Sequence, residues 1–193
     1  MAEYAEKTFT MKDGNVFAIR SATPTDASQL VTYLKAMFRE APYIYFTAEE
    51  FEMTEEQEAQ FLKDLEESQS GIMLLALFDG KIIGNIDGRA RELRRIEHRV
   101  SFGMSVHPDF KGQGVGKTLL QCFLDFAKNN KVIEKVELGV IEENTAAYNL
   151  YYSQGFREEG RSLKGFYSDE GKYHDEIHMG LWVKLHRSIQ EVL

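Results

Sequence analysis

Three glycines at alternate positions, Gly112, Gly114 and Gly116, are the feature of this chain best suited to chemistry. Without side chains, neighbouring main-chain N–H groups can turn toward one ligand and approach it closely. A long apolar-periodic segment follows, so the first turn of a helix is expected to add unpaired N–H groups and the positive end of its dipole. The loop is therefore predicted to bind an anion, most naturally a phosphate.

Two common phosphate-binding motifs fail at single positions. A nucleoside triphosphate loop requires glycine where this chain has Lys111, and a dinucleotide fingerprint starting at Gly112 requires glycine where it has Lys117. A glycine-rich turn between a strand and a helix is also an ordinary packing device. A second motif is needed to choose among these interpretations.

The loop has the spacing of the pyrophosphate loop of GNAT acetyltransferases, which is Gln or Arg, two free positions, Gly, one free position, then Gly or Ala. Lys111, Gly114 and Gly116 occupy these positions, and Val106 and Pro108 form the usual lead-in. Residues 144–156 are similar to the second signature of that family, through Asn144, Ala147, Leu150, Tyr151, Gly155 and Phe156. Over about residues 17–183, the chain resembles a GNAT N-acetyltransferase.

The resemblance implies an α/β fold with a mixed, largely antiparallel central sheet flanked by helices, in a single domain of residues 1–193. It implies transfer of the acetyl group of acetyl-CoA to a primary amine by direct attack in a ternary complex. The closing segment resembles the bacterial branch near the ribosomal-protein N-terminal and small-amine acetyltransferases. The acceptor stays open between a small amine and a protein N-terminus. A noncatalytic acetyl-CoA sensor is the alternative.

The same resemblance assigns the cofactor contacts. Main-chain groups of Met104 and Val106 would pair with the pantetheine arm, and Asn144 would contact pantetheine as well as cap its helix. The pyrophosphate would lie on the loop, formed by Lys111, Gly112, Gln113, Gly114, Val115, Gly116, Lys117 and Thr118. Lys111 replaces the usual Gln or Arg, which keeps a charge but loses a planar hydrogen-bonding group.

Tyr151 occupies the family position whose phenol protonates the departing thiolate. Packing of one helix is the alternative for Tyr148, Tyr151 and Tyr152, and the motif favours the functional interpretation for Tyr151 alone. A base is also needed, because a primary amine is mostly protonated at neutral pH. Where many members carry a glutamate, this chain has His98, which suits proton transfer, and Glu97 is the second candidate. A histidine among the apolar residues of this strand is also commonly a structural residue.

Composition limits the remaining classes. A net charge of −8 argues against nucleic-acid binding, and no apolar run approaches the length of a membrane span. The acidic, polar segment 1–7 does not resemble a signal peptide, so a cytoplasmic protein is expected. His174 and His178 show no third partner, so no metal site is predicted. A homodimer is left open.

The order of elements follows from periodicity and from helix and turn signals. A helix should begin at the capping segment 23–26, and a glutamate-rich helical segment, 47–68, should present its acids to solvent. Asp79-Gly80 marks a hairpin turn. Strands are predicted at 16–20, 72–78, 81–86, 96–106, 136–141, 156–164 and 173–183, with further helices from the glycine loop to about 129 and at 144–154.

Overall fold

The computed structural model describes residues 4–184, and it confirms the mixed α/β fold. The sheet has the strand order β1-β2-β3-β4-β5-β6-β8-β7. β5 (Arg99–Val106) and β6 (Lys135–Ile141) pair in parallel over Arg99–Ser101, whereas β1 with β2, β2 with β3, β3 with β4, β6 with β8 and β7 with β8 pair antiparallel. Among the described residues, no helix combines the length and hydrophobicity needed to cross a bilayer.

The chain divides into two units. Unit 1 contains the residues up to Arg89 together with Gly103–Phe123, and unit 2 contains Ala90–Phe102 and the chain from Leu124 onward. All three crossings fall inside elements: near the end of β4 (Lys81–Ala90), within β5, and within α3 (Val115–Asn129).

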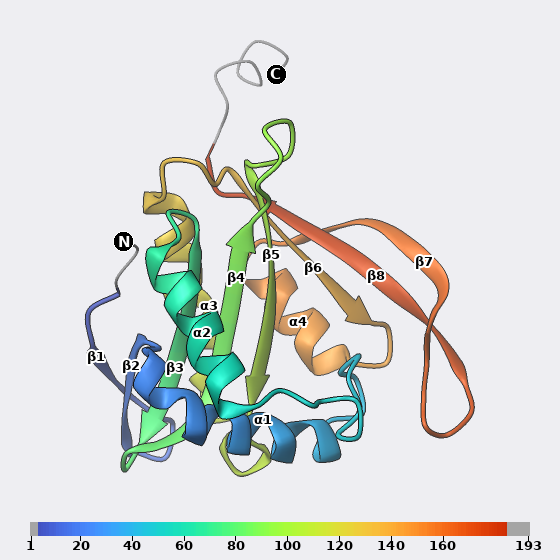
Figure 1. Cartoon of the computed structure of the whole chain (residues 1–193). Helices are drawn as coiled ribbons and strands as arrows, with labels where there is room; N and C mark the ends of the chain where they lie inside the picture. The colour runs from blue at the N-terminus through green and yellow to red at the C-terminus, as the bar shows by residue number, and fades with distance from the viewer. Residues whose placement is uncertain (1–3, 185–193) are drawn as a thin grey trace. The chain divides into compact units, whose positions relative to one another are not determined.

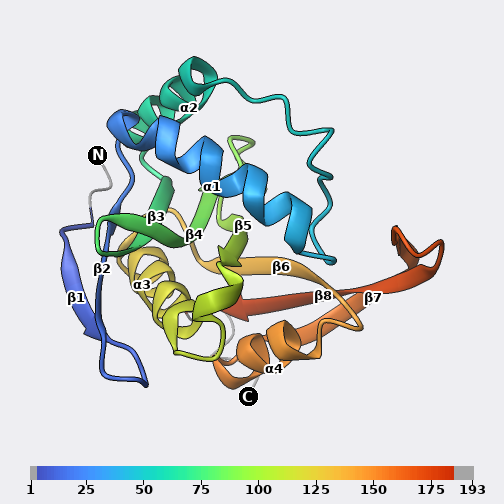
Figure 2. The same ribbon diagram turned by 90° about the horizontal axis from the view of Figure 1, so that it is seen from below.

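Unit 1 is built around a hairpin and two antiparallel strands beside it (Figure 1). The hairpin joins β3 (Gly71–Phe78) to β4 through the predicted Asp79-Gly80 turn, and β2 (Val16–Ser21) pairs with β3. β1 (Lys7–Thr10) pairs with β2 and was not predicted, because its alternation of polar and apolar residues spans only four positions. Figure 2 shows α1 (Ala27–Glu40) and α2 (Glu55–Glu67) on one face of these strands and the start of α3 on the other.

The core of unit 1 lies beneath α1 and α2. Leu30, Met37, Leu62, Met73 and Leu75 pack there, at most 5% exposed. Burying each such side chain contributes on the order of 1.5–3 kcal/mol. Alternate residues of β3 face these helices, and so do the residues that pair with them on β4.

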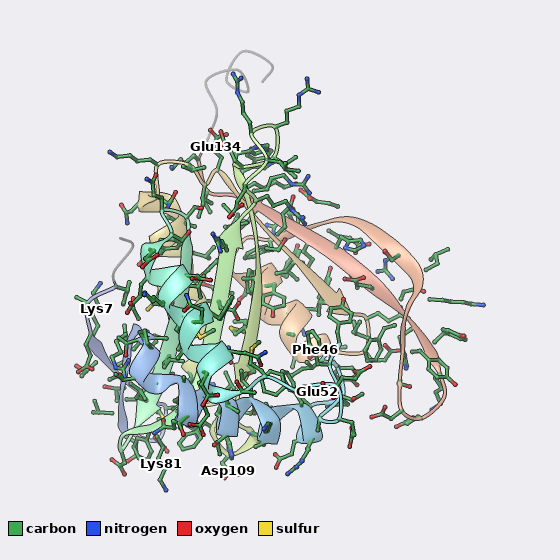
Figure 3. The ribbon with its side chains drawn as sticks, viewed as in Figure 1. Lys7, Phe46, Glu52, Lys81, Asp109 and Glu134 are labelled. Atoms are coloured by element: carbon green, nitrogen blue, oxygen red, sulfur yellow. The ribbon has the colours of Figure 1, made fainter. Side chains whose placement is uncertain are left out.

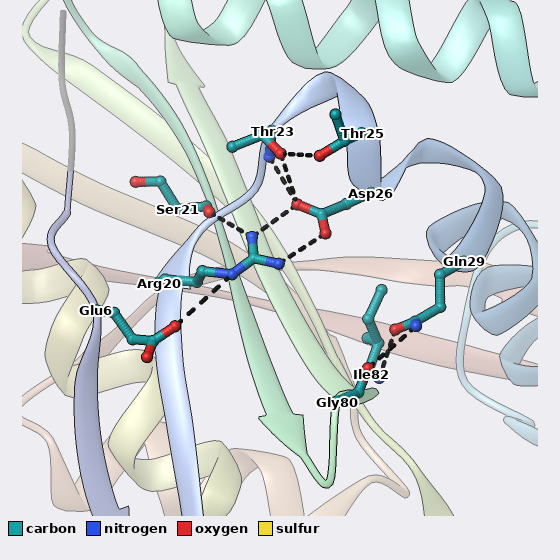
Figure 4. A network of polar contacts seen from close by, with 9 residues as sticks. All are labelled: Glu6, Arg20, Ser21, Thr23, Thr25, Asp26, Gln29, Gly80 and Ile82. Atoms are coloured by element: carbon teal, nitrogen blue, oxygen red, sulfur yellow. Dashed lines mark hydrogen bonds and ion pairs between the residues drawn. The ribbon is translucent and has the colours of Figure 1, made fainter.

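Polar contacts fix the position of α1 in unit 1 (Figure 4). The Arg20 guanidinium donates two 2.7 Å hydrogen bonds to the Asp26 carboxylate, and the Thr23 N–H donates to Asp26 at 2.9 Å. One turn further along α1, the Gln29 side chain accepts from the Ile82 N–H (2.8 Å) and donates to the Gly80 carbonyl (3.1 Å). These bonds attach the first turns of α1 to β2 and to the β3–β4 hairpin.

Unit 2 combines the first part of β5 with β6, α4 (Thr145–Ser153), β7 (Arg157–Tyr167) and β8 (Tyr173–Trp182). β7 and β8 form the predicted second hairpin, which extends well beyond the strands it pairs with (Figure 1). β5 begins at Arg99 rather than at 96, because residues 91–98 form a turn closed by the Ile96 N–H to the Leu93 carbonyl (2.8 Å).

Candidate functional site

The glycine loop leaves β5 at Val106 and reaches α3 through a short 3-10 turn, Pro108–Phe110; Asp109 marks this turn in Figure 3. Gly112 and Gly114 have φ values of +77° and +97°, a conformation that side chains other than glycine adopt with strain. Nothing lies within 4 Å of where a Cβ would stand at either residue, so the space at these two positions is open.

The main-chain N–H groups of this loop divide into those bonded within the protein and those free to bind an anion. Three N–H groups are used internally: Lys111 donates to Pro108 (3.1 Å), Gln113 to Phe110 (3.4 Å) and Thr118 to Gly114 (3.0 Å). Five N–H groups have no partner in the described part of the chain, those of Gly112, Gly114, Val115, Gly116 and Lys117. Clustered donors at the start of a 15-residue helix form an anion cradle.

The cradle is firmly attached to unit 1. The Gln113 carbonyl accepts a hydrogen bond from the Lys12 N–H (3.2 Å), which ties the loop to the β1–β2 connection. The Lys111 and Lys117 side chains are exposed, and neither forms an ion pair among the described residues. Both ammonium groups are therefore available to a bound phosphate.

The main chain of β5 also presents groups for a ligand. At its two ends, the Arg99 carbonyl accepts from Arg91 and the His107 N–H donates to Ile83, so the odd-numbered residues direct their main-chain groups toward β4. Because these directions alternate along an antiparallel strand, Met104 and Val106 direct theirs to the opposite edge. That edge is the one expected to pair with an extended ligand.

A polar cluster, consisting of Tyr33, Asn85 and Ser105, lies on the face of unit 1 beneath α1 and α2. Ser105 Oγ donates a 2.6 Å hydrogen bond to Asn85 Oδ1, so the Tyr33 hydroxyl, 2.9 Å away, donates to Ser105. Asn85 is 5% exposed, and burial raises the pKa of Tyr33 above its ordinary value. The cluster joins α1, β4 and β5 through buried hydrogen bonds.

A carboxylate pair, Glu58 on α2 and Asp87 on β4, lies on the same face of unit 1. Asp87 pairs in register with Met73, whose side chain belongs to the core beneath the helices. Burial, together with the negative charge of Glu58, raises the pKa of Asp87 to about 7. Burial also raises the pKa of Glu58, which is 2% exposed and whose Oε1 has no hydrogen-bond partner among the described residues.

Tyr151 lies in unit 2 on α4 and is 8% exposed. Its ring makes edge contacts with Phe102 (centroids 5.7 Å apart) and Phe156 (6.0 Å), so the ring does pack the helix. Burial raises the pKa of its hydroxyl to about 12. In the described structure this hydroxyl has no hydrogen-bond partner, so its proton remains available to a ligand.

Asn144 caps α4, as the sequence predicted: its side-chain oxygen accepts from the Ala147 N–H at 3.3 Å. His98 and Glu97 also belong to unit 2 and come before β5 begins. The His98 ring stacks on Trp182 with centroids 6.1 Å apart, and its carbonyl accepts from the Glu134 and Lys135 N–H groups. Glu97 is exposed.

Three other polar residues, His174, His178 and Arg99, have partners inside unit 2. His174 contacts the Glu143 carboxylate and Ser168, and His178 lies 2.7 Å from the Ser162 hydroxyl. The cationic Arg99 forms a bidentate pair with Glu137, at 2.7 and 2.8 Å. Within residues 4–184, no group of three or more His, Cys, Asp or Glu residues is arranged to hold a metal ion.

Sequence reasoning missed the polar cluster and the carboxylate pair. It assigned the glutamates of 47–68 to a solvent-exposed face, and this is wrong for Glu58, which is buried. The signal was present, because Glu58 lies four residues before Leu62 and seven before Leu65, on the apolar stripe of α2. Asp87 stands two residues after Asn85, on the same inward face of β4.

Comparison with known proteins identifies the family. Residues 29–156, more than half of the chain, match the Acetyltransferase (GNAT) family. The chain is 28% identical to the L-amino acid N-acetyltransferase AaaT of Escherichia coli over 106 residues, which cover 55% of this chain and 65% of AaaT. It is 27% identical to the spermidine N(1)-acetyltransferase of Vibrio cholerae over 131 residues, which cover 68% of this chain and 74% of that enzyme.

Among solved structures, a GNAT-family acetyltransferase from Streptococcus pneumoniae superimposes with a TM-score of 0.84 at 30% identity, covering 86% of this chain and 99% of that one. The anion cradle, the order of the elements and the family match agree with one another. The chain is an acetyltransferase of the GNAT family.

Proposed function

We propose that this protein transfers the acetyl group of acetyl-CoA to a primary amine, by direct attack of the amine on the thioester in a ternary complex. The observation that carries the proposal is the cradle of five unpartnered N–H groups. Its donors suit a pyrophosphate, and the open space at Gly112 and Gly114 would be filled by any side chain there.

The outward main-chain groups of Met104 and Val106 would hold the pantetheine arm as an added strand. A main-chain N–H of this stretch would also stabilise negative charge on the thioester oxygen during attack. We assign to the Lys111 and Lys117 ammonium groups a supporting contact with the phosphates, and to Asn144 a contact with pantetheine. Thr118 supports the loop, since its hydroxyl donates to the Gly114 carbonyl at 3.0 Å.

We assign protonation of the departing thiolate to Tyr151. A hydroxyl with a pKa of about 12 stays protonated at neutral pH and can donate. Apolar surroundings of the kind made by Phe102 and Phe156 also raise the pKa of a thiol, so the difference in proton affinity is smaller than that between this buried phenol and a thiol in water.

The acceptor is an amine of undetermined identity. The compounds named for the two relatives, an L-amino acid and spermidine, both carry primary amino groups. In unit 1 the α1–α2 connection could contact an apolar part of an acceptor: Phe46 is 57% exposed and packs on Phe38, with centroids 6.0 Å apart (Figure 3). His98 and Glu97 are the residues that the sequence suggests as the base that deprotonates the amine.

The test measures release of coenzyme A thiol from acetyl-CoA with polyamines, aminoglycosides, amino acids and short peptides bearing free N-termini. Wild type is compared with Gly114→Ala, whose added Cβ strains the cradle. Gly171→Ala is the matched control, because Gly171 has a similar φ of +76° and only an ordinary contact at 3.5 Å, but lies in the turn between β7 and β8.

Turnover with one acceptor class is expected. We expect Gly114→Ala to weaken acetyl-CoA binding more than about 10-fold by calorimetry, whereas Gly171→Ala leaves it unchanged. Equal affinities in all three proteins would refute the cradle. Tight binding without turnover across the panel would favour the acetyl-CoA sensor instead.

A further inference from the structure

The carboxylate pair has no positively charged group among the causes that shift its pKa values. Two carboxyl groups that repel each other and have lost part of their hydration resist ionising together unless a cation joins them. The causes that raise the pKa of Asp87 are burial and Glu58, and both act in the same direction. Glu58 Oε1 is buried without a hydrogen-bond partner in the described part of the chain, which is a costly condition for a polar atom.

No cationic group is among the causes that shift the pKa values of the two carboxyl groups. The titratable group on α2 is Glu58. On α1 it is Tyr33, which is hydrogen-bonded to Ser105. β3 and β5 contribute Met73 and Gly103, which do not titrate. Arg89 follows Asp87 by two residues on the same face of β4, and it does not appear among the groups that shift the pKa of Asp87.

Asp87, unlike Glu58, is partly reachable from solvent. β5 is an interior strand of the sheet, yet Gly103 is exposed, so the surface of the sheet is open at this position. A Cβ built on Gly103 would lie 3.6 Å from Asp87 Oδ1, which places the carboxylate at the edge of the opening. Asp87 itself is partly exposed, whereas Glu58 is buried.

We propose that Glu58 and Asp87 form the binding site for the acceptor in its protonated form, a primary ammonium ion, and that Asp87 removes the proton that frees its lone pair. The inference rests on the proposed acetyl transfer and specifies its acceptor side. A single ammonium charge suits two carboxylates that lack a cation, and its N–H groups can satisfy Glu58 Oε1.

The proton and electron balance is complete. The ammonium nitrogen gives one proton to Asp87, which passes it to water, and the freed lone pair forms the C–N bond to the thioester carbonyl carbon. The C–S bond breaks and its electron pair leaves on sulfur. The second nitrogen proton is lost as the amide forms and ends on the thiol, so the overall products are the amide, the free thiol and one proton released to solvent.

The raised pKa of Asp87 suits this chemistry. A carboxylate whose acid has an ordinary pKa is too weak a base to deprotonate an ammonium ion. A carboxylate whose acid has a pKa near the working pH is both ionised often enough and basic enough to accept the proton. Arrival of the cation first stabilises the ionised pair, and departure of the proton then leaves a neutral amine beside a neutral acid.

The kinetic arm of the test uses the best amine from the acceptor panel. Asp87→Asn keeps the shape and removes the base, so kcat/KM should fall more than about 100-fold while the affinity for acetyl-CoA stays within about 3-fold of wild type. Wild-type kcat/KM should rise with pH through an apparent pKa of about 7, the value to which burial and Glu58 raise the pKa of Asp87. Glu58→Gln should move this rise to lower pH, because it removes the repulsion that raises the pKa of Asp87.

Two control variants distinguish this site from a general effect of surface charge and from His98 as the base. Glu55→Gln removes an exposed carboxylate from the same helix and should leave the pH profile unchanged. His98→Gln removes the histidine favoured by the sequence, and loss of the pH-dependent rise in that variant, with the rise retained in Asp87→Asn, would overturn the inference. That outcome leaves the proposed acetyl transfer intact, because wild type still turns over.

A binding arm works without turnover. The carboxyl carbon of Asp87 is followed by NMR through a pH titration, in about 50 mM ethylammonium chloride or in sodium chloride of the same ionic strength. Ethylammonium should lower the pKa of Asp87 in wild type, and the effect should weaken in Glu58→Gln. The same pKa in both salts would overturn the inference, whatever the enzyme's activity.

Discussion

Individual residues in this protein depart from their ordinary proton affinities in ways that suit their proposed roles. Asp87 and Glu58 are carboxyl groups drawn toward the neutral form, and Tyr151 is a phenol that holds its proton more tightly than usual. In all three, burial is the first cause. Such groups lower the stability of the fold where they ionise, and they are concentrated at functional sites.

Asp87 should leave a measurable mark on stability. Its folded pKa of about 7 lies above the 3.8 of an unperturbed aspartate, so the folded state holds the proton more tightly. Its favourable contribution is complete below about pH 4 and is lost as the pH rises through 7. Relative to wild type, Asp87→Asn should therefore gain stability between about pH 4 and pH 7, by at most about 4 kcal/mol, and the gain should then level off. Urea unfolding at several pH values measures it; a pH-independent difference would contradict the shifted pKa.

Tyr151 can be tested by removing one oxygen. Tyr151→Phe should lower kcat more than about 100-fold with little change in acetyl-CoA affinity, because the ring contacts with Phe102 and Phe156 remain. Tyr152→Phe is the control, since Tyr152 lies on the same helix and is 52% exposed. Near-wild-type turnover in Tyr151→Phe would remove this hydroxyl from the mechanism.

Secondary structure elements were predicted well where the sequence carries local signals. The Asp79-Gly80 turn and the caps at Thr23 and Asn144 all lie where predicted. The glutamate-rich segment was harder to place. Its helix begins at Glu55 because Thr54 and Gln57 form a capping box, with the Gln57 N–H donating to Thr54 Oγ1 at 3.2 Å.

The site was predictable only in part, for a reason that also lies at the level of elements. The glycine loop is one continuous segment, so its spacing is visible in the sequence. The carboxylate pair joins α2 to β4, and the polar cluster joins α1, β4 and β5. Contacts between distant segments depend on packing, which local periodicity does not encode.

The start of α1 offers a test at this scale. Burial alone would raise the pKa of Asp26, but the hydrogen bonds from Arg20 and Thr23 outweigh it and lower the pKa. Its stabilising effect is therefore present above the unfolded pKa and is lost as the pH falls through the lower folded value. Asp26→Asn should reduce stability by about 1–2 kcal/mol at neutral pH and by less near about pH 3. Asp64→Asn, an exposed site on α2, should change little in chemical denaturation.

At the scale of the whole molecule, the two units share elements instead of being joined by linkers. β4, β5 and α3 each contribute residues to both units. Neither unit can unfold completely without disrupting a strand or a helix of the other. This continuity supports the proposal that residues 1–193 form a single domain.

Calorimetry checks that proposal. Thermal unfolding should give one transition whose calorimetric and van't Hoff enthalpies agree, since shared elements couple the two units. Addition of acetyl-CoA should raise the midpoint without splitting the peak. Two separate transitions, with only one of them shifted by acetyl-CoA, would show that the units unfold independently.

Gly103 gives this scaffold a natural point for redesign. It has no left-handed φ, and an added Cβ would meet Asp87 Oδ1 at 3.6 Å, which is an ordinary contact, so larger residues can enter without strain in the main chain. Each added carbon would narrow the opening in front of the carboxylate pair while leaving the anion cradle untouched. Selection at this one codon could therefore change which amines are accepted without altering how the acetyl donor is held.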